Sequence, residues 1–257
     1  MIIDADVHIT PFKDNDLCIT AERLIEIMDE AKIDKARAQP HSPYIRTNLN
    51  ACLKYVYEAA KKYPARLLGF GWVDPSLGMD DARDTVKRCL YEYGFYGIKF
   101  NGALHQFFVD DPKIVFPLVE EIAKAQKIVA FHSACDAYEK THPYRVMHVA
   151  KAFPDVPILM VHMGGAAVND LSQAAIEAAQ QCPNITLVGS EARAGSILKA
   201  IKTLGANRVC FGSDTPFEIA RVELAKYHAL LDGYVTQEEK DMVLGKNIER
   251  IFSQIKI

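Results

Sequence analysis

The sequence Ile128-Val129-Ala130-Phe131-His132 runs four apolar residues into a histidine, and Ile158-Leu159-Met160-Val161-His162 repeats this pattern further along the chain. A helical pattern, Pro143–Phe153, lies between the two runs. Short continuous apolar runs are typical of parallel strands that are buried on both faces. We therefore predict a β-α-β unit in which each strand ends in a histidine.

The same alternation of short apolar runs and longer amphipathic stretches extends through the whole chain. The predicted strands are Ile2–His8, Lys35–Pro40, Arg66–Val73, Phe95–Phe100, Lys127–His132, Pro157–His162, Ile185–Ser190 and Arg208–Gly212. Helix start signals support the pattern: Asp111-Pro112 predicts a helix over Pro112–Ala125, and Thr236-Gln237-Glu238-Glu239 is a capping box.

Eight strands that alternate with helices suit either a closed barrel or an open, doubly wound sheet. An open sheet of the nucleotide-binding type would carry a glycine-rich turn after the first strand. Here the first strand is followed by Ile9-Thr10-Pro11-Phe12. We therefore predict an α/β fold, a (β/α)₈ TIM barrel that forms a single domain over residues 1–257, close to the roughly 250 residues typical of that fold.

Composition narrows the classes of partner. The formal net charge is −3, and acidic and basic residues are interspersed, which argues against a nucleic-acid-binding surface. No apolar run reaches the roughly 18 residues of a membrane span, and the N-terminus has no signal-peptide pattern. The six cysteines form no C-x-x-C pair, so we expect reduced thiols and a cytoplasmic protein acting on a small molecule.

Four of the predicted strands end in residues that can bind metal. Asp6 and His8 lie two apart on the first strand, so their side chains point the same way, about 6.6 Å apart along it. His132, His162 and Asp214 end three further strands. Because all strands of a barrel finish at one rim, these side chains should gather there around one divalent ion.

Five segments and a closing helix also resemble a known family in their order along the chain. They are Ile3-Asp4-Ala5-Asp6-Val7-His8, Gly94–Phe100, Phe131-His132-Ser133, Val161-His162-Met163-Gly164-Gly165, Phe211-Gly212-Ser213-Asp214-Thr215-Pro216-Phe217 and Asn247–Phe252. The chain resembles the amidohydrolase superfamily, in particular the branch that contains aminocarboxymuconate-semialdehyde decarboxylase and related metal-dependent hydrolases.

This resemblance implies one divalent metal ion held by Asp6, His8, His132 and Asp214, with His162 beside it as an acid or base. Zinc is the expected ion. The family's usual first motif is H-x-H, however, and the aspartate at its first position makes manganese a possible alternative. Members of the family often form homodimers, so a homodimer is also possible here.

The chemistry remains open between three interpretations. In the first, a metal-dependent hydrolase, the ion activates water, Asp214 takes its proton and His162 protonates the leaving group. The second is a metal-dependent non-oxidative decarboxylase of a small unsaturated or aromatic acid. The third is a barrel without catalysis, which the joint presence of these residues disfavours. The breadth of the family's chemistry favours the hydrolase.

Three basic residues are candidates for binding a substrate carboxylate. Arg46 follows the second strand, Lys99 lies on the fourth and Arg193 follows the seventh. Arginine suits bidentate capture of a carboxylate. Lys99 could instead bridge two metal ions, as a carboxylated lysine does in some members of the superfamily. The sequence also leaves Glu191 as a possible substrate contact and Trp72 as a residue that either lines the pocket or packs in the core.

Overall fold

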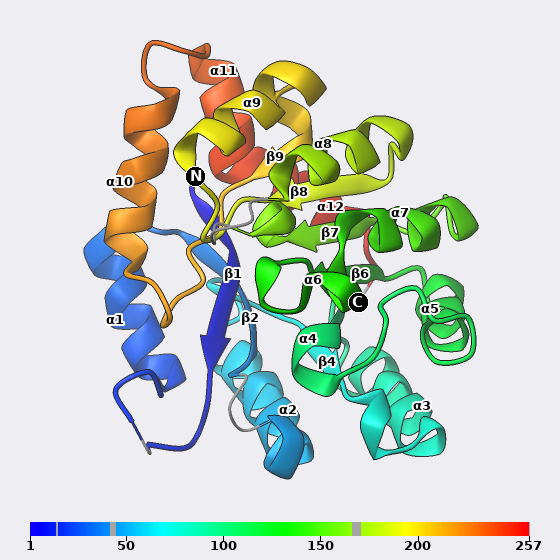
Figure 1. The fold of residues 1–257 in the computed structure, drawn as a ribbon. Coiled ribbons are helices and arrows are strands. Elements are labelled where there is room, and N and C mark those ends of the chain that lie inside the picture. The colour runs from blue at the N-terminus through cyan, green and yellow to red at the C-terminus, as the bar shows by residue number, and fades with distance from the viewer. Residues whose placement is uncertain (14, 42–44, 166–170, 257) are drawn as a thin grey trace.

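The computed structural model describes residues 1–13, 15–41, 45–165 and 171–256, without the side chains of residues 45–47. Within this part of the chain, strands form the centre and helices surround them (Figure 1). The strands are β1 (Ile3–Ile9), β2 (Lys35–Pro40), β3 (Leu67–Gly69), β4 (Gly71–Val73), β5 (Gly97–Phe100), β6 (Ile128–His132), β7 (Ile158–Val161), β8 (Ile185–Val188) and β9 (Val209–Cys210).

The helices fall between these strands and after the last of them. They are α1 (Ala21–Ala31), α2 (Ile45–Lys62), α3 (Met79–Lys87), α4 (Gly102–His105), α5 (Val115–Lys124), α6 (Tyr138–Thr141), α7 (Pro143–Ala152), α8 (Ser172–Gln181), α9 (Ala194–Leu204), α10 (Ala220–Leu231), α11 (Gln237–Asp241) and α12 (Asn247–Ser253). Short 3₁₀ or π segments are η2 (Pro75–Leu77), η3 (Arg88–Glu92), η4 (Cys135–Ala137), η5 (His162–Gly164), η6 (Ala206–Arg208) and η7 (Met242–Lys246).

The strands close into a parallel barrel. β1, β2 and β3 pair in that order, as do β4 through β9. β3 and β4 are two parts of the predicted third strand, and the amide of Phe70 between them donates to the carbonyl of Ala38 at 2.9 Å. The ring closes after β9, where the amide of Ala5 donates to the Phe211 carbonyl at 3.1 Å and that of His8 to the Thr215 carbonyl at 2.8 Å. These pairings confirm the predicted (β/α)₈ barrel.

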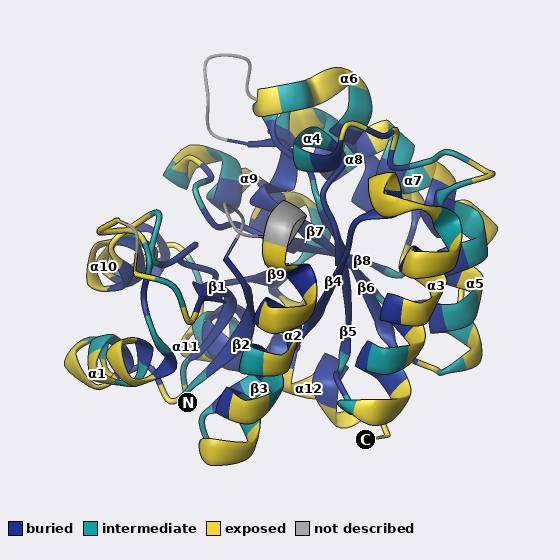
Figure 2. Ribbon diagram, turned by 90° about the horizontal axis from the view of Figure 1, so that it is seen from below, coloured by how far each residue is buried: buried dark blue, intermediate teal, exposed yellow. Residues whose placement is uncertain are grey.

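Apolar side chains fill the lower part of the barrel interior. Ile3, Ile128 and Leu159 belong to one buried cluster there, and α12 packs against it through Phe252. Long outer helices such as α1 and α5 bury one face and expose the other (Figure 2). Because α12 covers the N-terminal end of the barrel, the interior is left for chemistry only at the C-terminal ends of the strands.

β1 changes the direction of its side chains part-way along. Its register against β2 is irregular between Asp4 and Val7. Ala5 packs in the interior cluster, whereas Val7 packs in the outer cluster beneath the helices. A bulge of this kind shifts the two-residue alternation by one position. As a result Asp6 and His8, rather than Val7, point into the upper part of the barrel.

Of two predicted helix starts, one differs from the structure and the other is confirmed. The helix predicted from Pro112 begins at Val115, because the Asp111 carboxylate accepts the amide hydrogens of Lys113 and Ile114 at 2.8 and 3.1 Å and holds the chain in a turn. The capping box at Thr236 is confirmed, with its partner Glu239. Among the described helices, none combines the length and apolar character that a membrane crossing requires.

Candidate active site

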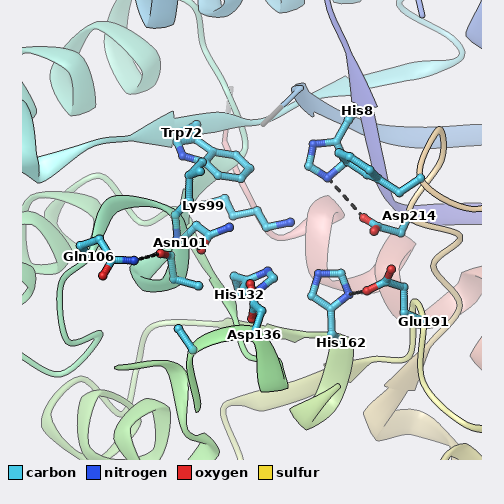
Figure 3. Close-up of a pocket in the computed structure, with 14 residues that line it drawn as sticks. His8, Trp72, Lys99, Asn101, Gln106, His132, Asp136, His162, Glu191 and Asp214 are labelled. Atoms are coloured by element: carbon cyan, nitrogen blue, oxygen red, sulfur yellow. Dashed lines mark hydrogen bonds and ion pairs between the residues drawn. The ribbon is translucent and has the colours of Figure 1, made fainter. Parts of the chain in front are cut away.

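A cavity of about 400 Å³ opens at the C-terminal end of the barrel (Figure 3). Residues from widely separated parts of the chain line it, namely His8, Trp72, Lys99, Asn101, Ala103, Leu104, Gln106, His132, Asp136, Ala137, His162, Glu191, Asp214 and Phe217. The strand ends therefore bring the predicted residues His8, Lys99, His132, His162 and Asp214 around one space.

Asp6, His8 and Asp214 form a compact group of candidate metal ligands. Their ligand atoms lie within 4.8 Å of one another, and all three side chains are buried. His8 Nε2 is 3.4 Å from Asp214 Oδ1 and 3.9 Å from Asp6 Oδ1. His8 Nδ1 lies 2.8 Å from the Pro40 carbonyl, which fixes the ring with Nε2 towards the carboxylates. Burial lowers the pKa of His8 to about 3, so the imidazole is neutral, as a metal ligand must be.

The charges of this group fit a divalent cation. Burial and the neighbouring charge of Asp6 raise the pKa of Asp214 well above its ordinary value, because two carboxylates in one buried place repel each other. A divalent ion would relieve that repulsion and reverse the shift. Two carboxylate oxygens and one imidazole nitrogen are ligands that both zinc and manganese accept. The residues present therefore fit the ion that the resemblance implies.

Asp6 is also the counterion of two buried cations. Its Oδ1 accepts from Arg37 at 2.7 Å, from Gln39 at 2.8 Å and from Lys99 at 3.3 Å, and its Oδ2 accepts from the Ser190 hydroxyl at 2.8 Å. Burial alone would raise the pKa of Asp6, but Lys99 and Arg37 outweigh it and hold the pKa well below its ordinary value. The carboxylate is therefore ionised, and its orientation is fixed from four sides.

Sequence reasoning missed Arg37 and Gln39 as parts of the site. Both lie on β2 and are fully buried, and the Arg37 side chain also donates to the carbonyl of Ala5. The sequence carried a usable signal, since the polar residues Lys35, Arg37 and Gln39 alternate with alanines in the predicted strand Lys35–Pro40. A charged residue at an inward position of a buried strand needs a partner of opposite charge, and here that partner is Asp6.

His132 reaches the cavity but makes its closest polar contact elsewhere. Its Nε2 lies 2.9 Å from Asp136 Oδ1, and its ring stands 4.8 Å from that of His162. It does not join the compact group of Asp6, His8 and Asp214 among the described residues. Asp136, in the turn that follows β6, was not anticipated from the sequence.

His162 is held between two strand ends. Its Nδ1 lies 3.1 Å from the Ser190 hydroxyl and 3.6 Å from Glu191 Oε2, while its Nε2 is 4.0 Å from Asp6 Oδ2. His162, Glu191 and Asp214 also form a second group whose ligand atoms lie within 4.8 Å of one another. The imidazole thus stands between Glu191 and the candidate metal ligands.

The environment sets the protonation of this pair. Burial and the nearby His132 ring hold the pKa of His162 well below its ordinary value, so the ring is neutral. Burial and the charge of Asp214 raise the pKa of Glu191 to about 7. A carboxyl group that titrates near neutral pH beside a neutral imidazole is suited to proton transfer.

Three of these residues share an unusual backbone conformation. His162, Glu191 and Asp214 have φ angles of 67°, 58° and 59°, in the left-handed region that non-glycine residues rarely occupy. Each such residue costs about 1–3 kcal/mol, and these conformations cluster at functional sites. Each one follows a barrel strand and lines the cavity. No local sequence pattern indicates the left-handed conformation.

The family follows from comparison with known proteins. A family model of amidohydrolases matches residues 3–254, which is nearly the whole chain. The chain belongs to the amidohydrolase family. No curated protein matches it.

Solved structures agree with the amidohydrolase barrel. A dihydroxybenzoic acid decarboxylase from Polaromonas sp., with bound manganese and the inhibitor 2-nitroresorcinol, is 17% identical, with a TM-score of 0.76 over 100% of this chain and 98% of that one. The 5-carboxyvanillate decarboxylase from Sphingomonas paucimobilis is 15% identical, with a TM-score of 0.76 over 98% of this chain and 98% of that one. The 4-oxalomesaconate hydratase from Rhodopseudomonas palustris is 18% identical, with a TM-score of 0.72 over 99% of this chain and 96% of that one. At these identities the likeness shows the fold.

The three predicted substrate-binding residues are placed differently in this amidohydrolase. Lys99 lines the cavity, is 1% exposed, and has its ammonium 5.2 Å from the centre of the Trp72 ring. Arg193 is exposed at the start of α9 and is not among the described residues that line the cavity. Arg46 lies in the first turn of α2, with its side chain outside the described part of the chain. Lys99 is therefore the candidate that the structure brings to the site.

Proposed function

We propose that this amidohydrolase is a metal-dependent, non-oxidative decarboxylase of a small aromatic or unsaturated carboxylic acid. The observation that carries the proposal is that Lys99, His8 and Asp214 line one cavity, with the ligand atoms of buried Asp6, His8 and Asp214 within 4.8 Å of one another. A substrate carboxylate placed there would meet the buried ammonium on one side and a bound cation on the other. The two decarboxylases of the same fold support this interpretation over the hydrolase favoured by the sequence.

In this proposal Asp6, His8 and Asp214 hold the metal ion, and His132 is the fourth ligand. His132 would have to exchange its contact with Asp136 for the ion. Two carboxylates shift the preference of the site towards harder ions, so we propose Mn²⁺ ahead of Zn²⁺. A bound ion would supply Lewis acidity, which stabilises negative charge on the substrate.

His162 and Glu191 supply the proton that decarboxylation requires. When the bond to the carboxylate breaks, carbon dioxide leaves, the electron pair stays on the substrate carbon, and that carbon then takes a proton. Glu191, with its pKa raised to about 7, is protonated in about half of the molecules at neutral pH, and its Oε2 lies 3.6 Å from His162 Nδ1. His162 passes a proton from Nε2 to the carbon and regains one at Nδ1 from Glu191.

Carbon dioxide release from a panel of acids tests the proposal. The purified protein would be loaded with Mn²⁺ or Zn²⁺ and incubated with dihydroxybenzoates and 5-carboxyvanillate, and with esters and lactones in parallel. We expect metal-dependent release of carbon dioxide from at least one acid. Metal-dependent turnover of an ester or lactone without carbon dioxide would establish the hydrolase instead. A native protein that binds no metal would leave only the non-catalytic interpretation.

A further inference from the structure

A buried chain of polar groups runs behind the cavity wall and has no part in the chemistry proposed above. Trp72 Nε1 donates to His105 Nε2 at 2.9 Å, and His105 Nδ1 lies 2.8 Å from Asp74 Oδ2. The Ser76 amide and hydroxyl donate to the other carboxylate oxygen, at 2.9 and 2.6 Å. Trp72, His105 and Asp74 are each no more than 2% exposed.

The direction of this chain follows from elementary chemistry. An indole N–H can only donate, so His105 Nε2 must accept and the ring proton must sit on Nδ1, facing Asp74. Burial favours the neutral form of Asp74, but His105 and Ser76 outweigh it and hold the pKa of the carboxyl below its ordinary value. An ionised Asp74 thus fixes the His105 tautomer, and His105 fixes the rotation of the Trp72 ring.

The fixed indole lies directly against the only cationic side chain among the described residues that line the cavity. The Lys99 ammonium stands 5.2 Å from the Trp72 ring centre, within the range of a cation–π interaction. Trp72 and Lys99 are also register partners on β4 and β5. Asp6 Oδ1 holds the same ammonium from another direction at 3.3 Å. Two contacts of different kinds therefore set the position of one charge.

We propose that Trp72, held by the Asp74–His105 pair, positions the Lys99 ammonium for the carboxylate of the substrate. The inference rests on the proposed function, because it assumes an acidic substrate. Trp72 is then a positioning residue that acts through Lys99, and His105 and Asp74 act through Trp72. The indole face limits where the flexible lysine can go, so the charge is in place before the acid binds.

A double-mutant cycle on the manganese-loaded protein tests this role. Dissociation constants for 2,6-dihydroxybenzoate and 5-carboxyvanillate would be measured by calorimetry in the His162→Ala background, where turnover should be slow, for that chain alone and with Trp72→Leu, Lys99→Met or both. We expect Trp72→Leu to weaken binding roughly tenfold, and to weaken it no further once Lys99 is gone. Trp72→Phe keeps an aromatic face and should restore most of the loss. His105→Leu, which frees the indole to rotate, should fall between the His162→Ala chain alone and Trp72→Leu.

Phe217 provides the matched control. It lines the same cavity, stacked on His41 with 4.9 Å between ring centres, and makes no cation–π contact with Lys99. The losses of acid binding caused by Phe217→Leu and Lys99→Met should therefore be additive. The affinity for Mn²⁺ should be unchanged in Trp72→Phe.

The outcomes separate two failures. Additive losses for Trp72→Leu and Lys99→Met would overturn the positioning role and leave the proposed function standing. A manganese-loaded wild-type protein that releases carbon dioxide from no acid of the panel would instead overturn the proposed function, and this inference with it.

Discussion

Asp214 is a buried carboxyl group whose neighbours make its ionisation unfavourable unless a cation is present. We expect Asp214→Asn to lower Mn²⁺ affinity at least tenfold, since it removes both a ligand oxygen and a charge from the group with Asp6 and His8. Equilibrium dialysis with metal analysis measures this. Glu218→Gln is the control, because Glu218 acts on Asp214 through its charge but is exposed. Equal affinity in both variants would remove Asp214 from the ligand set.

His162 carries a different expectation, because its side chain is proposed to move protons rather than to bind metal. His162→Ala should keep its Mn²⁺ within a few-fold of wild type while turnover falls roughly 10²- to 10⁴-fold, the usual contribution of a positioned acid or base. Metal content and kcat of the same preparation decide the matter. An unchanged kcat would exclude His162 from the mechanism, and a metal-free variant would make it a ligand.

At the scale of the strand, Gly97 allows β5 to lie close to β6. A Cβ added at Gly97 would sit 2.1 Å from the Ile128 carbonyl oxygen, a backbone atom that can move only if the strands separate. We expect Gly97→Ala to lower the free energy of unfolding by about 1–3 kcal/mol. Urea unfolding measures it. Gly195→Ala in α9 is the matched control, since nothing lies within 4 Å of its added Cβ. Equal stability of the two variants would contradict this account.

For the molecule as a whole, buried thiols predict a loss of stability in alkali. Burial raises the pKa of Cys89 and of Cys210 to about 12, from an ordinary value of 9.0. Both thiols therefore stay neutral in the folded chain, while the unfolded chain ionises them from about pH 9. The stability that this difference provides is complete below pH 9 and is lost as pH rises towards 12, by up to about 1.4 kcal/mol per pH unit for each thiol.

The contribution of the thiols is measured by how steeply the free energy of unfolding falls with pH in wild type and in a variant without them. Urea unfolding in reducing buffer would be followed at pH 8, 9 and 10 for wild type and for Cys89→Ala/Cys210→Ala. The variant is expected to be less stable at every pH, because it loses buried volume, but to decline less steeply above pH 9. Parallel declines would show that the two thiols do not contribute to the alkaline loss.

Local pattern determined the fold and part of the site from the sequence alone. Apolar runs such as Ile158–Val161 must be buried on both faces, and their alternation with helices suits a barrel or an open sheet. The lack of a glycine-rich turn after the first strand then favoured the barrel. The capping box at Thr236 depends only on residues three apart, so it too could be foreseen. The predicted meeting of His8 and Asp214 followed from barrel geometry, because every strand ends at the same rim.

Only the tertiary structure decided how these groups are partnered. The four contacts to Asp6 come from residues on three other strand ends, at separations in the chain that no periodicity links. The turn of Glu191 into the cavity depends on a left-handed backbone that its sequence does not indicate. Residue types and strand order can be read from the local sequence. Charge pairs and strained turns depend on which residues the folded chain places next to each other, and these contacts decide which candidates share one cavity.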